Sequence, residues 1–576
     1  MKWIVRVNTK TGKIAKEKAS AEELQWGGRR LISKFLLREV PPTCDPLGRY
    51  NKLIIAPGLL GDSAITTTGK FSVGGKSPLT RGVKESDVGG EAGRKIADLG
   101  IKALVLEELP DAPVTSVLKV TLDKIELIEM AELKGKLVSE TIKLLRETFG
   151  KEAGLLCVGP AGEMKLGGAG IAVSGPQDVQ VRYAGRGGLG AVMGSKGVKA
   201  IVVDATGAPS PAVFDKALLR EAGKALVQGI MADPKTENRH VYGTPAVLTL
   251  CNEIGILPTR NFSAGRFEKA AEICGDRVAE LIGQRGGDGR SGTPCVRGCV
   301  IACSNIFPDP TGKRIVASLQ YENIALLGSN CGIGDIDAIA ELNNLCNEVG
   351  VDAIETGAAI GVAMEAGVVS FGDAEGAKDL IRQIGRGTWL GRILGNGVVV
   401  TGKVLGVRRV PAIKGQAIPA YDPRSLKGNG VTYVTSPMGA DHTAGNMLET
   451  AKTINPLGIE KQVEGSRKLQ IRGAILDTMG LCLFTRPPFT KNPDLFLPLL
   501  KGRYGWDLAY ADVQRMGIDT LETEREFNRR SGAGEEFNDM PEFMREEPLP
   551  PMNSVYDLPL SEMQRVWDVK IPEDVF

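Results

Sequence analysis

The sequence has only two histidines in 576 residues, His240 and His442. A site built from several imidazoles, such as a three-histidine zinc centre, is therefore excluded. No run approaches the ~18 consecutive apolar residues that cross a bilayer. The opening MKWIVRVNTKTGKIAKEK lacks the apolar core and cleavage site of a secretory signal, so we expect a cytoplasmic protein.

An excess of charge of one sign is also missing. Lysine and arginine total 71 against 69 aspartates and glutamates, which leaves a net charge of +2. Balanced charge without long single-sign runs argues against a nucleic-acid binder and against a membrane-surface protein. An enzyme acting on a small molecule is the simplest expectation.

Glycine is abundant, at 73 residues, or about 13% against the ~7% of average usage. Such an excess indicates tight turns and places where the backbone approaches another group closely. The ten cysteines, in a long chain without a secretory signal, indicate thiols or metal ligands rather than a disulfide framework.

The pattern predicts an α+β protein with a β-rich N-terminal domain followed by two mainly helical domains. Short apolar runs such as WIVRV (3–7), LIIAP (53–57) and AIVVDA (200–205) predict strands. Residues 335–350 have helical apolar spacing, with Asp335 as N-cap and Gly350 at the C-terminal end. We expect domains at 1–207, 208–404 and 405–576, and an acidic, proline-rich arm over the surface after about residue 540.

The segment TPCVRGCVIACSN (293–305) contains three cysteines at spacing four, Cys295, Cys299 and Cys303. Three close thiols and one distant cysteine are typical of a four-iron four-sulfur cluster, since iron in such clusters prefers thiolate ligands. Zinc is the alternative, but zinc sites usually have two close pairs, and no second pair exists here. Cys482 is the candidate fourth ligand.

Two hexapeptides share one layout. In DTMGLC (477–482) a helix is predicted to end at Gly480, and the chain then turns sharply, which places Asp477 and Cys482 close together. Asp477 could accept hydrogen bonds from a ring with adjacent N–H groups while Cys482 binds iron. NEVGVD (347–352) has the same order, with Gly350 at the helix end and Asp352 after it.

Two glycine-rich loops carry basic residues suited to phosphate groups. In 181–205 the candidates are Arg182, Arg186, Lys196 and Lys199; in 66–93 they are Lys70, Lys76 and Arg81. Gly185, Gly187 and Gly190 also match a dinucleotide G-x-G-x-x-G pattern, with Asp204 near the expected offset. A solvated, purely structural role is the alternative for each basic residue.

Together, DTMGLC, NEVGVD, the cysteine run, RYAGRGGLGAVMGSKGVKAI (182–201), KSPLT (76–80) and EREFNRRSG (524–532) resemble the tungsten-containing aldehyde:ferredoxin oxidoreductase family. The resemblance covers nearly the whole chain in the family's order. It implies a tungsten or molybdenum atom held by two pyranopterin cofactors between the N-terminal domain and the helical domains. A 4Fe-4S cluster would lie beside one pterin, and Mg²⁺ would bridge the pterin phosphates.

The resemblance also implies roles for individual residues. Cys295, Cys299, Cys303 and Cys482 would bind the cluster. Residues at the pterins, their phosphates and the magnesium would be Lys70, Asp87, Gly89, Arg182, Tyr183, Gly185, Asn347, Val351, Asp352, Asp477 and Leu481.

This sequence departs from the family at several of these positions. The first cysteine spacing is four rather than three, Asn347 replaces aspartate, Lys70 replaces arginine, and Asp87 replaces asparagine. The E-x-x-H pair that bridges subunits through iron in some members is ELNN (341–344) here. Since Asn344 is a poor iron ligand, we predict a homodimer or hetero-oligomer without bridging iron.

Oxidation of an aldehyde requires addition of water to the carbonyl and a base that takes up protons. The family uses a glutamate and a histidine, which match Glu322 in QYENIALLG (320–328), next to Tyr321, and His442 in GADHTAG (439–445). A buried glutamate has a raised pKa, and histidine titrates near neutrality, so both suit acid–base work. We expect His240 at the surface or in a substrate channel.

The leading hypothesis is an aldehyde oxidoreductase that passes electrons to ferredoxin or to an iron–sulfur subunit. Within the same family, reduction of aromatic coenzyme A thioesters is the alternative. A NAD or flavin dehydrogenase would explain the glycines at 185–190 but neither the cysteine run nor DTMGLC. A non-catalytic iron–sulfur subunit would not need Glu322 and His442.

Overall fold

The computed structural model describes residues 2–175, 181–532, 539–571 and 574–576. Its first 203 residues contain two six-stranded sheets, of order β2-β1-β6-β3-β4-β5 and β11-β10-β9-β12-β7-β8. The strands are β1 (Trp3–Asn8), β2 (Ile14–Lys18), β3 (Leu53–Pro57), β4 (Phe71–Lys76), β5 (Val83–Val88), β6 (Ile101–Glu107), β7 (Ser116–Val120), β8 (Ile125–Glu129), β9 (Gly154–Cys157), β10 (Ile171–Ser174), β11 (Val181–Ala184) and β12 (Val198–Val203).

Alternation along the strands gives each sheet two apolar faces. In β1, Val5 and Val7 enter a core shared by both sheets, whereas Ile4 faces α2 (Gly28–Glu39). In β12, Val203 enters the shared core and Val202 packs towards α4 (Val138–Phe149). The predicted β-rich first domain is confirmed, and both of its sheets are covered on their outer faces by helices.

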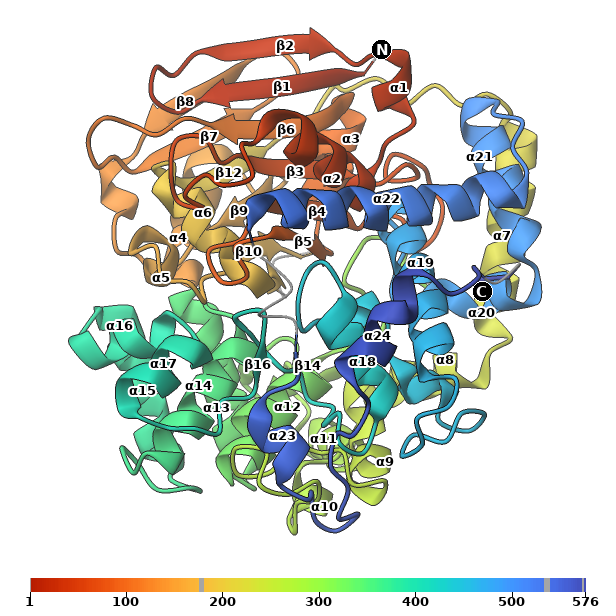
Figure 1. The fold of residues 1–576 in the computed structure, drawn as a ribbon. Helices are drawn as coiled ribbons and strands as arrows, with labels where there is room; N and C mark the ends of the chain where they lie inside the picture. Colours follow the sequence, from red (N-terminus) through yellow and green to blue (C-terminus); the bar gives the residue numbers. More distant parts are fainter. Residues whose placement is uncertain (1, 176–180, 533–538, 572–573) are drawn as a thin grey trace.

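The rest of the chain is mainly helical, as predicted. Residues 234–435 lie below the sheets in Figure 1, whereas the helices at 216–231, 496–504 and 510–531 lie at the level of the sheets. Asp335 caps α13 (Ile336–Val349) by accepting a hydrogen bond from Asp337 N at 3.0 Å, and Gly350 ends this helix with a φ of 82°. The helices that position the site are α8 (Pro234–Tyr242), α12 (Tyr321–Leu327), α13 (Ile336–Val349), α14 (Ala353–Glu365), α18 (Lys427–Thr435), α19 (Gln462–Met479) and α22 (Tyr510–Ser531).

The long helix α22 crosses the picture at the level of the first sheet in Figure 1, and it packs against α2, which is far away in sequence. The C-terminal segment passes over the helices, as expected of an arm, but its apolar side chains enter the core. Tyr556 is 1% exposed, and its hydroxyl donates to the Lys427 carbonyl at 3.2 Å. No helix in the described part of the chain has both the length and the apolar character required to cross a membrane.

Candidate active site

The four cysteines predicted to share one cluster lie together. Cys295, Cys299 and Cys303 occupy the segment between β13 (Arg290–Thr293) and β14 (Ser304–Pro308), and Cys482 follows α19. Burial, together with the charges of Cys295 and Cys482, raises the pKa of Cys299 to about 12. The same two neighbours raise the pKa of Cys303, after burial. All four are free thiols and partly exposed.

Among the described residues, no three His, Cys, Asp or Glu side chains form a group that could hold a single metal ion. This holds for the four cysteine thiols too, which lie near one another without forming such a group among the described residues. Four neighbouring thiols delivered from two distant segments are instead the donor set that iron–sulfur clusters use.

The hexapeptide DTMGLC (477–482) forms the predicted tight turn at the end of a helix. Helix α19 ends at Gly480, which has a φ of 75°, and Leu481 N donates to Leu476 O at 3.0 Å. A Cβ at Gly480 would lie 2.9 Å from the Lys70 carbonyl oxygen, so glycine also allows close approach of the β3–β4 connection. Asp477 and Cys482 therefore both lie beside the N-terminal domain.

Asp477 belongs to a group of buried charges. It accepts from Arg29 Nη1 at 3.2 Å. The pKa of Asp477 is raised to about 7, because burial and the Asp87 charge, which raise it, outweigh Arg29 and Lys70, which lower it. Burial, together with Asp477 and Asp87, also raises the pKa of Glu85 well above its ordinary value.

Lys70 and Asp87 form an ion pair at the edge of this group. Burial lowers the pKa of Lys70, but the charges of Asp87, Cys482 and Cys295 outweigh burial and raise it overall. Gly89, two residues further on, lies against the cysteine loop, because a Cβ there would be 3.3 Å from Cys295 Sγ. The predicted phosphate-side residues Lys70, Asp87 and Gly89 are thus adjacent to the four thiols.

The hexapeptide NEVGVD (347–352) contacts the N-terminal domain next to strands β10 and β11 of its second sheet. Asp352 Oδ1 accepts from Ile354 N at 3.0 Å and caps α14, while Oδ2 accepts from Arg186 Nε at 3.3 Å. Val351 bridges to Ala169 of the N-terminal domain. The Tyr183 hydroxyl donates to the carbonyl oxygen of Asn347.

Two further predicted residues lie at the same interface. Arg182 donates to the hydroxyl of Ser304, directly after the cysteine loop, and to the hydroxyl of Ser318. Gly185 lies close to Asp352, since a Cβ there would be 3.9 Å from Asp352 Oδ1. The predicted cofactor residues therefore gather where the N-terminal domain meets the helices.

Glu322 and His442 face each other. Glu322 Oε1 lies 3.4 Å from His442 Nε2, and Glu322 Oε2 accepts from Ala420 N at 2.9 Å. Burial raises the pKa of Glu322; His442, Ala420 N–H and Arg186 lower it. The Tyr321 hydroxyl donates to the Ala420 carbonyl at 2.6 Å. The consecutive residues Tyr321 and Glu322 therefore bind the carbonyl and the N–H of Ala420.

Several buried polar atoms around these residues have no hydrogen-bond partner. On the sheet side they are Ser72 Oγ, Glu85 Oε1 and Asp87 Oδ1; on the helical side they are Glu322 Oε1, His442 Nδ1 and Gln416 Oε1. Buried polar atoms are normally paired. Two sets of unpaired donors and acceptors fit a polar group held between the domains.

Three basic residues of the glycine-rich loops are not available for phosphate. Lys76 Nζ donates to the Cys44 carbonyl at 2.7 Å, Lys196 Nζ to the Asn51 carbonyl at 2.7 Å, and Lys199 Nζ to Glu163 Oε2 at 2.7 Å. All three side chains are buried. The prediction of a phosphate-binding or solvated role is wrong for them, because each ammonium is held by the fold.

The dinucleotide pattern at 185–190 is also wrong. A Rossmann unit needs two neighbouring parallel strands joined by the helix. Here β11 and β12 are separated by β10 and β9, and each pairing between them is antiparallel. The other histidine, His240, is exposed, and its ring packs over Gly292.

No role is predicted for Arg29 from the sequence, and Glu524 enters the sequence patterns only as the first residue of the segment EREFNRRSG (524–532). Arg29 Nε and Nη2 each donate to a Glu524 oxygen at 2.8 Å, and both side chains are 0% exposed. Since Arg29 also binds Asp477, the Arg29–Glu524 pair connects α22 to the hexapeptide DTMGLC (477–482). The available signal was Glu524 itself, a carboxylate on the face of α22 that turns inward.

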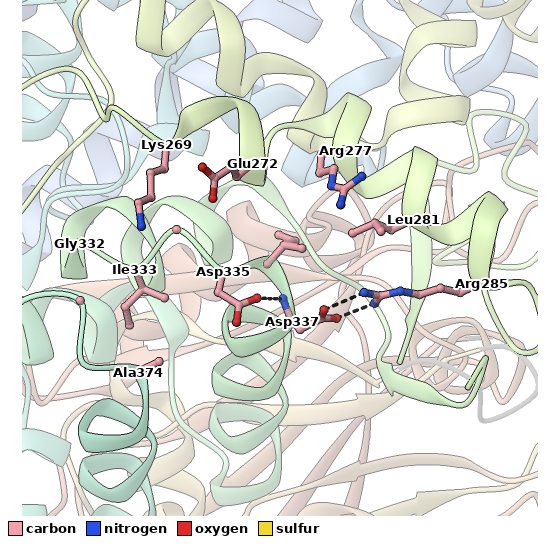
Figure 2. Close-up of a pocket in the computed structure, with 13 residues that line it drawn as sticks. Lys269, Glu272, Arg277, Leu281, Arg285, Gly332, Ile333, Asp335, Asp337 and Ala374 are labelled. Carbon is pink, nitrogen blue, oxygen red and sulfur yellow. Dashed lines mark hydrogen bonds and ion pairs between the residues drawn. The ribbon is translucent and has the colours of Figure 1, made fainter. Parts of the chain in front are cut away.

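A pocket of 490 Å³ lies apart from these residues, between α10 (Ala270–Ile273), α11 (Gly275–Arg285) and the start of α13 (Figure 2). Arg285 pairs with both oxygens of Asp337 at 2.5 and 2.7 Å, and Lys269 and Arg277 stand at its rim. None of the predicted site residues lines it.

Comparison with known proteins gives two family models. The model "Aldehyde ferredoxin oxidoreductase, N-terminal domain" matches residues 4–205, and "Aldehyde ferredoxin oxidoreductase, domains 2 & 3" matches residues 221–567. The tungsten-containing aldehyde ferredoxin oxidoreductase of Pyrococcus abyssi is 33% identical over 99% of this chain and 97% of its own length. That of Thermococcus kodakarensis is 32% identical over 95% of this chain and 91% of its own.

A solved structure is similar in fold. The active site complex BamBC of benzoyl coenzyme A reductase with 1,5-dienoyl-CoA superposes with a TM-score of 0.79. The alignment covers 98% of this chain and 93% of that chain at 17% identity, so it shows the fold alone.

Proposed function

The chain belongs to the aldehyde ferredoxin oxidoreductase family, and on this premise we propose that it oxidises an aldehyde to a carboxylic acid at a tungsten–bispterin centre. The electrons would leave singly through a 4Fe-4S cluster to ferredoxin or an iron–sulfur subunit. The observation that carries the proposal is the meeting of Cys482 with the 295–303 thiols beside Asp477.

The residues present fit these groups. The four thiols supply the ligands of the cluster. Asp477 and Asp352 stand at the ends of two helices where each could accept hydrogen bonds from a pterin, although Asp352 already caps α14. Contacts to the phosphates and their Mg²⁺ would come from Lys70, Asp87, Gly89, Arg182, Tyr183 and Gly185, with the backbone near Asn347, Val351 and Leu481.

The bound tungsten group supplies a two-electron acceptor, and the cluster supplies a one-electron relay. Overall, RCHO and H₂O give RCOOH, two protons and two electrons. Glu322 accepts a proton from the attacking water at Oε1, the oxygen with no hydrogen-bond partner. His442 Nε2, 3.4 Å away, receives or returns that proton, and Tyr321 positions Ala420, which binds the other Glu322 oxygen.

The test is anaerobic purification followed by metal analysis, pterin fluorescence after oxidation, and turnover with a viologen dye. We expect tungsten or molybdenum, pterin and iron together, and oxidation of aliphatic or aromatic aldehydes. Turnover of an aromatic coenzyme A thioester instead would favour the alternative within the family. Material that binds no heavy metal, or that needs NAD, would contradict the proposal.

A further inference from the structure

A buried ion pair joins the first sheet to the turn that carries His442. Lys84 Nζ on β5 donates to Asp441 Oδ2 at 2.8 Å, and the two side chains are 0% and 8% exposed. The Lys84 stem is confined by Gly187, where a Cβ would lie 2.4 Å from Lys84 Cγ. The pair is therefore enclosed between β5, the 186–188 turn and the His442 turn.

Asp441 also shapes this turn. Its Oδ1 accepts from Thr443 N at 3.2 Å and from Thr443 Oγ1 at 2.9 Å, so it caps the short helix η6 (His442–Ala444). The preceding carbonyl, Ala440 O, accepts from Arg186 Nη1 at 2.5 Å and from Gln416 Nε2 at 2.8 Å. Residues 440 and 441 are thus held by three side chains from other elements, immediately before His442.

The Lys84–Asp441 ion pair affects the charges around the turn that carries His442. Burial raises the pKa of Asp441, but Lys84, Arg186 and His442 outweigh burial and hold it well below its ordinary value. Asp441 in turn raises the pKa of Glu322, against the lowering effect of His442 and Arg186. The charged and titratable groups that face Asp441, His442 and Glu322 are Lys84 of β5, Arg186 of η3 (Arg186–Gly188), Asp352 and Glu355 at α14, Cys251, Tyr321, Tyr421, and Tyr433 of α18.

We propose that Lys84 and Asp441 are positioning residues that hold the His442 ring against Glu322 and set the local charge in which this couple exchanges protons. The role rests on the proposed function, since it concerns the same acid–base couple. Lys84 acts from the N-terminal domain, so the couple is assembled only when that domain is docked on the helices. Neither residue needs to touch substrate or cofactor for this role.

The chain allows a direct test because it has only two histidines. In the intact protein labelled with ¹³C at histidine Cε1, two ring signals are expected, and His240→Asn assigns the remaining one to His442. Lys84→Met leaves the Asp441 anion without its main partner and favours the protonated ring, so the His442 titration midpoint should rise by about one pH unit. Asp441→Asn leaves Lys84 unbalanced, so the midpoint should fall by a similar amount.

The double variant Lys84→Met/Asp441→Asn removes both charges. Its midpoint should return close to that of the unmodified protein, while kcat stays about 10–100-fold low because the turn is no longer held. It also keeps the test valid if Lys84→Met alone does not fold. Arg503→Met, which breaks the buried Arg503–Asp62 pair elsewhere, should lower thermal stability but leave the His442 titration and the pH profile unchanged.

Midpoints that do not move, or that move in the same direction in both single variants, would overturn the inference. A double variant with full kcat would also overturn it. Because the NMR titration needs no turnover, an unmodified protein that titrates as expected but oxidises no aldehyde would contradict the proposed function alone.

Discussion

At the scale of single residues, the same side chain type serves opposite purposes according to what surrounds it. Lys70 directly precedes β4 and Lys76 ends it, six residues apart in the segment 66–93, which is rich in glycine and hydroxyl groups. Lys70 pairs with Asp87 beside the thiols, whereas Lys76 binds backbone carbonyls of residues 42 and 44. Burial likewise gives Glu322 a raised pKa that an exposed glutamate would not have.

Glu322→Gln should lower kcat at least about 100-fold, because the amide cannot accept a proton. In the unmodified protein the carboxylate form becomes available only above a raised pKa, so the rate should rise with pH above the ordinary glutamate value of 4.5. Steady-state rates with a viologen dye between pH 4.5 and 8 measure this. Glu23→Gln, at a buried glutamate on α1 (Ala21–Leu24), is the control; equal losses in both variants would contradict the assignment.

Cys482→Ser should lose the cluster, because a hydroxyl is a poor ligand for iron. Iron and sulfide content together with the reduced-state EPR signal measure the loss. Cys331→Ser, at a buried free cysteine whose Sγ is 3.3 Å from the Leu326 carbonyl, should keep both. Full iron content in Cys482→Ser would exclude this cysteine as the fourth ligand.

At the scale of elements, the ends of helices position the predicted cofactor residues. Helices α13 and α19 both end at a glycine with positive φ, and each is followed at once by a predicted cofactor residue. Strand β5 works by alternation: Lys84 faces the His442 turn, whereas Glu85 and Asp87 face Asp477. The single strand β5 therefore contacts both the turn that carries His442 and the group of buried charges around Asp477.

Gly480→Ala should destabilise the protein more than Gly406→Ala. Both glycines end helices in the left-handed region, with φ of 75° and 71°, so each substitution costs about 1 kcal/mol or more in backbone strain. At Gly480 the new Cβ would also meet the Lys70 carbonyl and Gly58, whereas nothing lies within 4 Å at Gly406. Thermal unfolding compares the two, and equal shifts would contradict the close-approach argument.

At the scale of the whole molecule, buried ion pairs join the N-terminal domain to the helices. Arg29 binds Glu524 and Asp477, Lys84 binds Asp441, and Asp62 binds Arg503 of α21 (Phe496–Tyr504). Breaking one partner of a buried pair leaves an uncompensated charge, which costs more than the pair contributes. The docking of the domains is therefore sensitive to single substitutions far from the thiols.

Asp62→Asn should reduce stability at neutral pH and weaken its dependence on acid. Burial raises the pKa of Asp62, but Arg503 and Lys2 outweigh burial and bring it to about 2 from 3.8. The carboxylate thus contributes about 2 kcal/mol above pH 3.8, and this is lost as the pH falls through about 2. Thermal unfolding between pH 2 and 7 measures it.

The control for that measurement is Asp507→Asn, since Asp507 forms an exposed pair with Lys501. Exposed pairs contribute little, so this variant should follow the unmodified protein at every pH. If Asp62→Asn kept the full acid dependence, the Asp62 carboxylate would not be the source of it.

Features that depend only on neighbouring residues could be predicted from the amino-acid sequence alone. Helix ends at Gly350 and Gly480, the Asp335 cap and the strands at 3–7 and 53–57 are local, because spacing and turn chemistry decide them. The family resemblance added the expectation that four thiols and two carboxylates share one site, and the family models and relatives confirm the family.

The pairing of buried charges, by contrast, follows from the packing of segments that are distant in sequence. Arg29 and Glu524 are 495 residues apart, and Lys84 and Asp441 are 357 apart, so no local pattern could pair them. The same holds for Lys76, Lys196 and Lys199, whose ammonium groups are taken by distant backbone or side-chain oxygens. Long-range packing selects each partner, because a buried charge is stable only where the fold brings another group to compensate it.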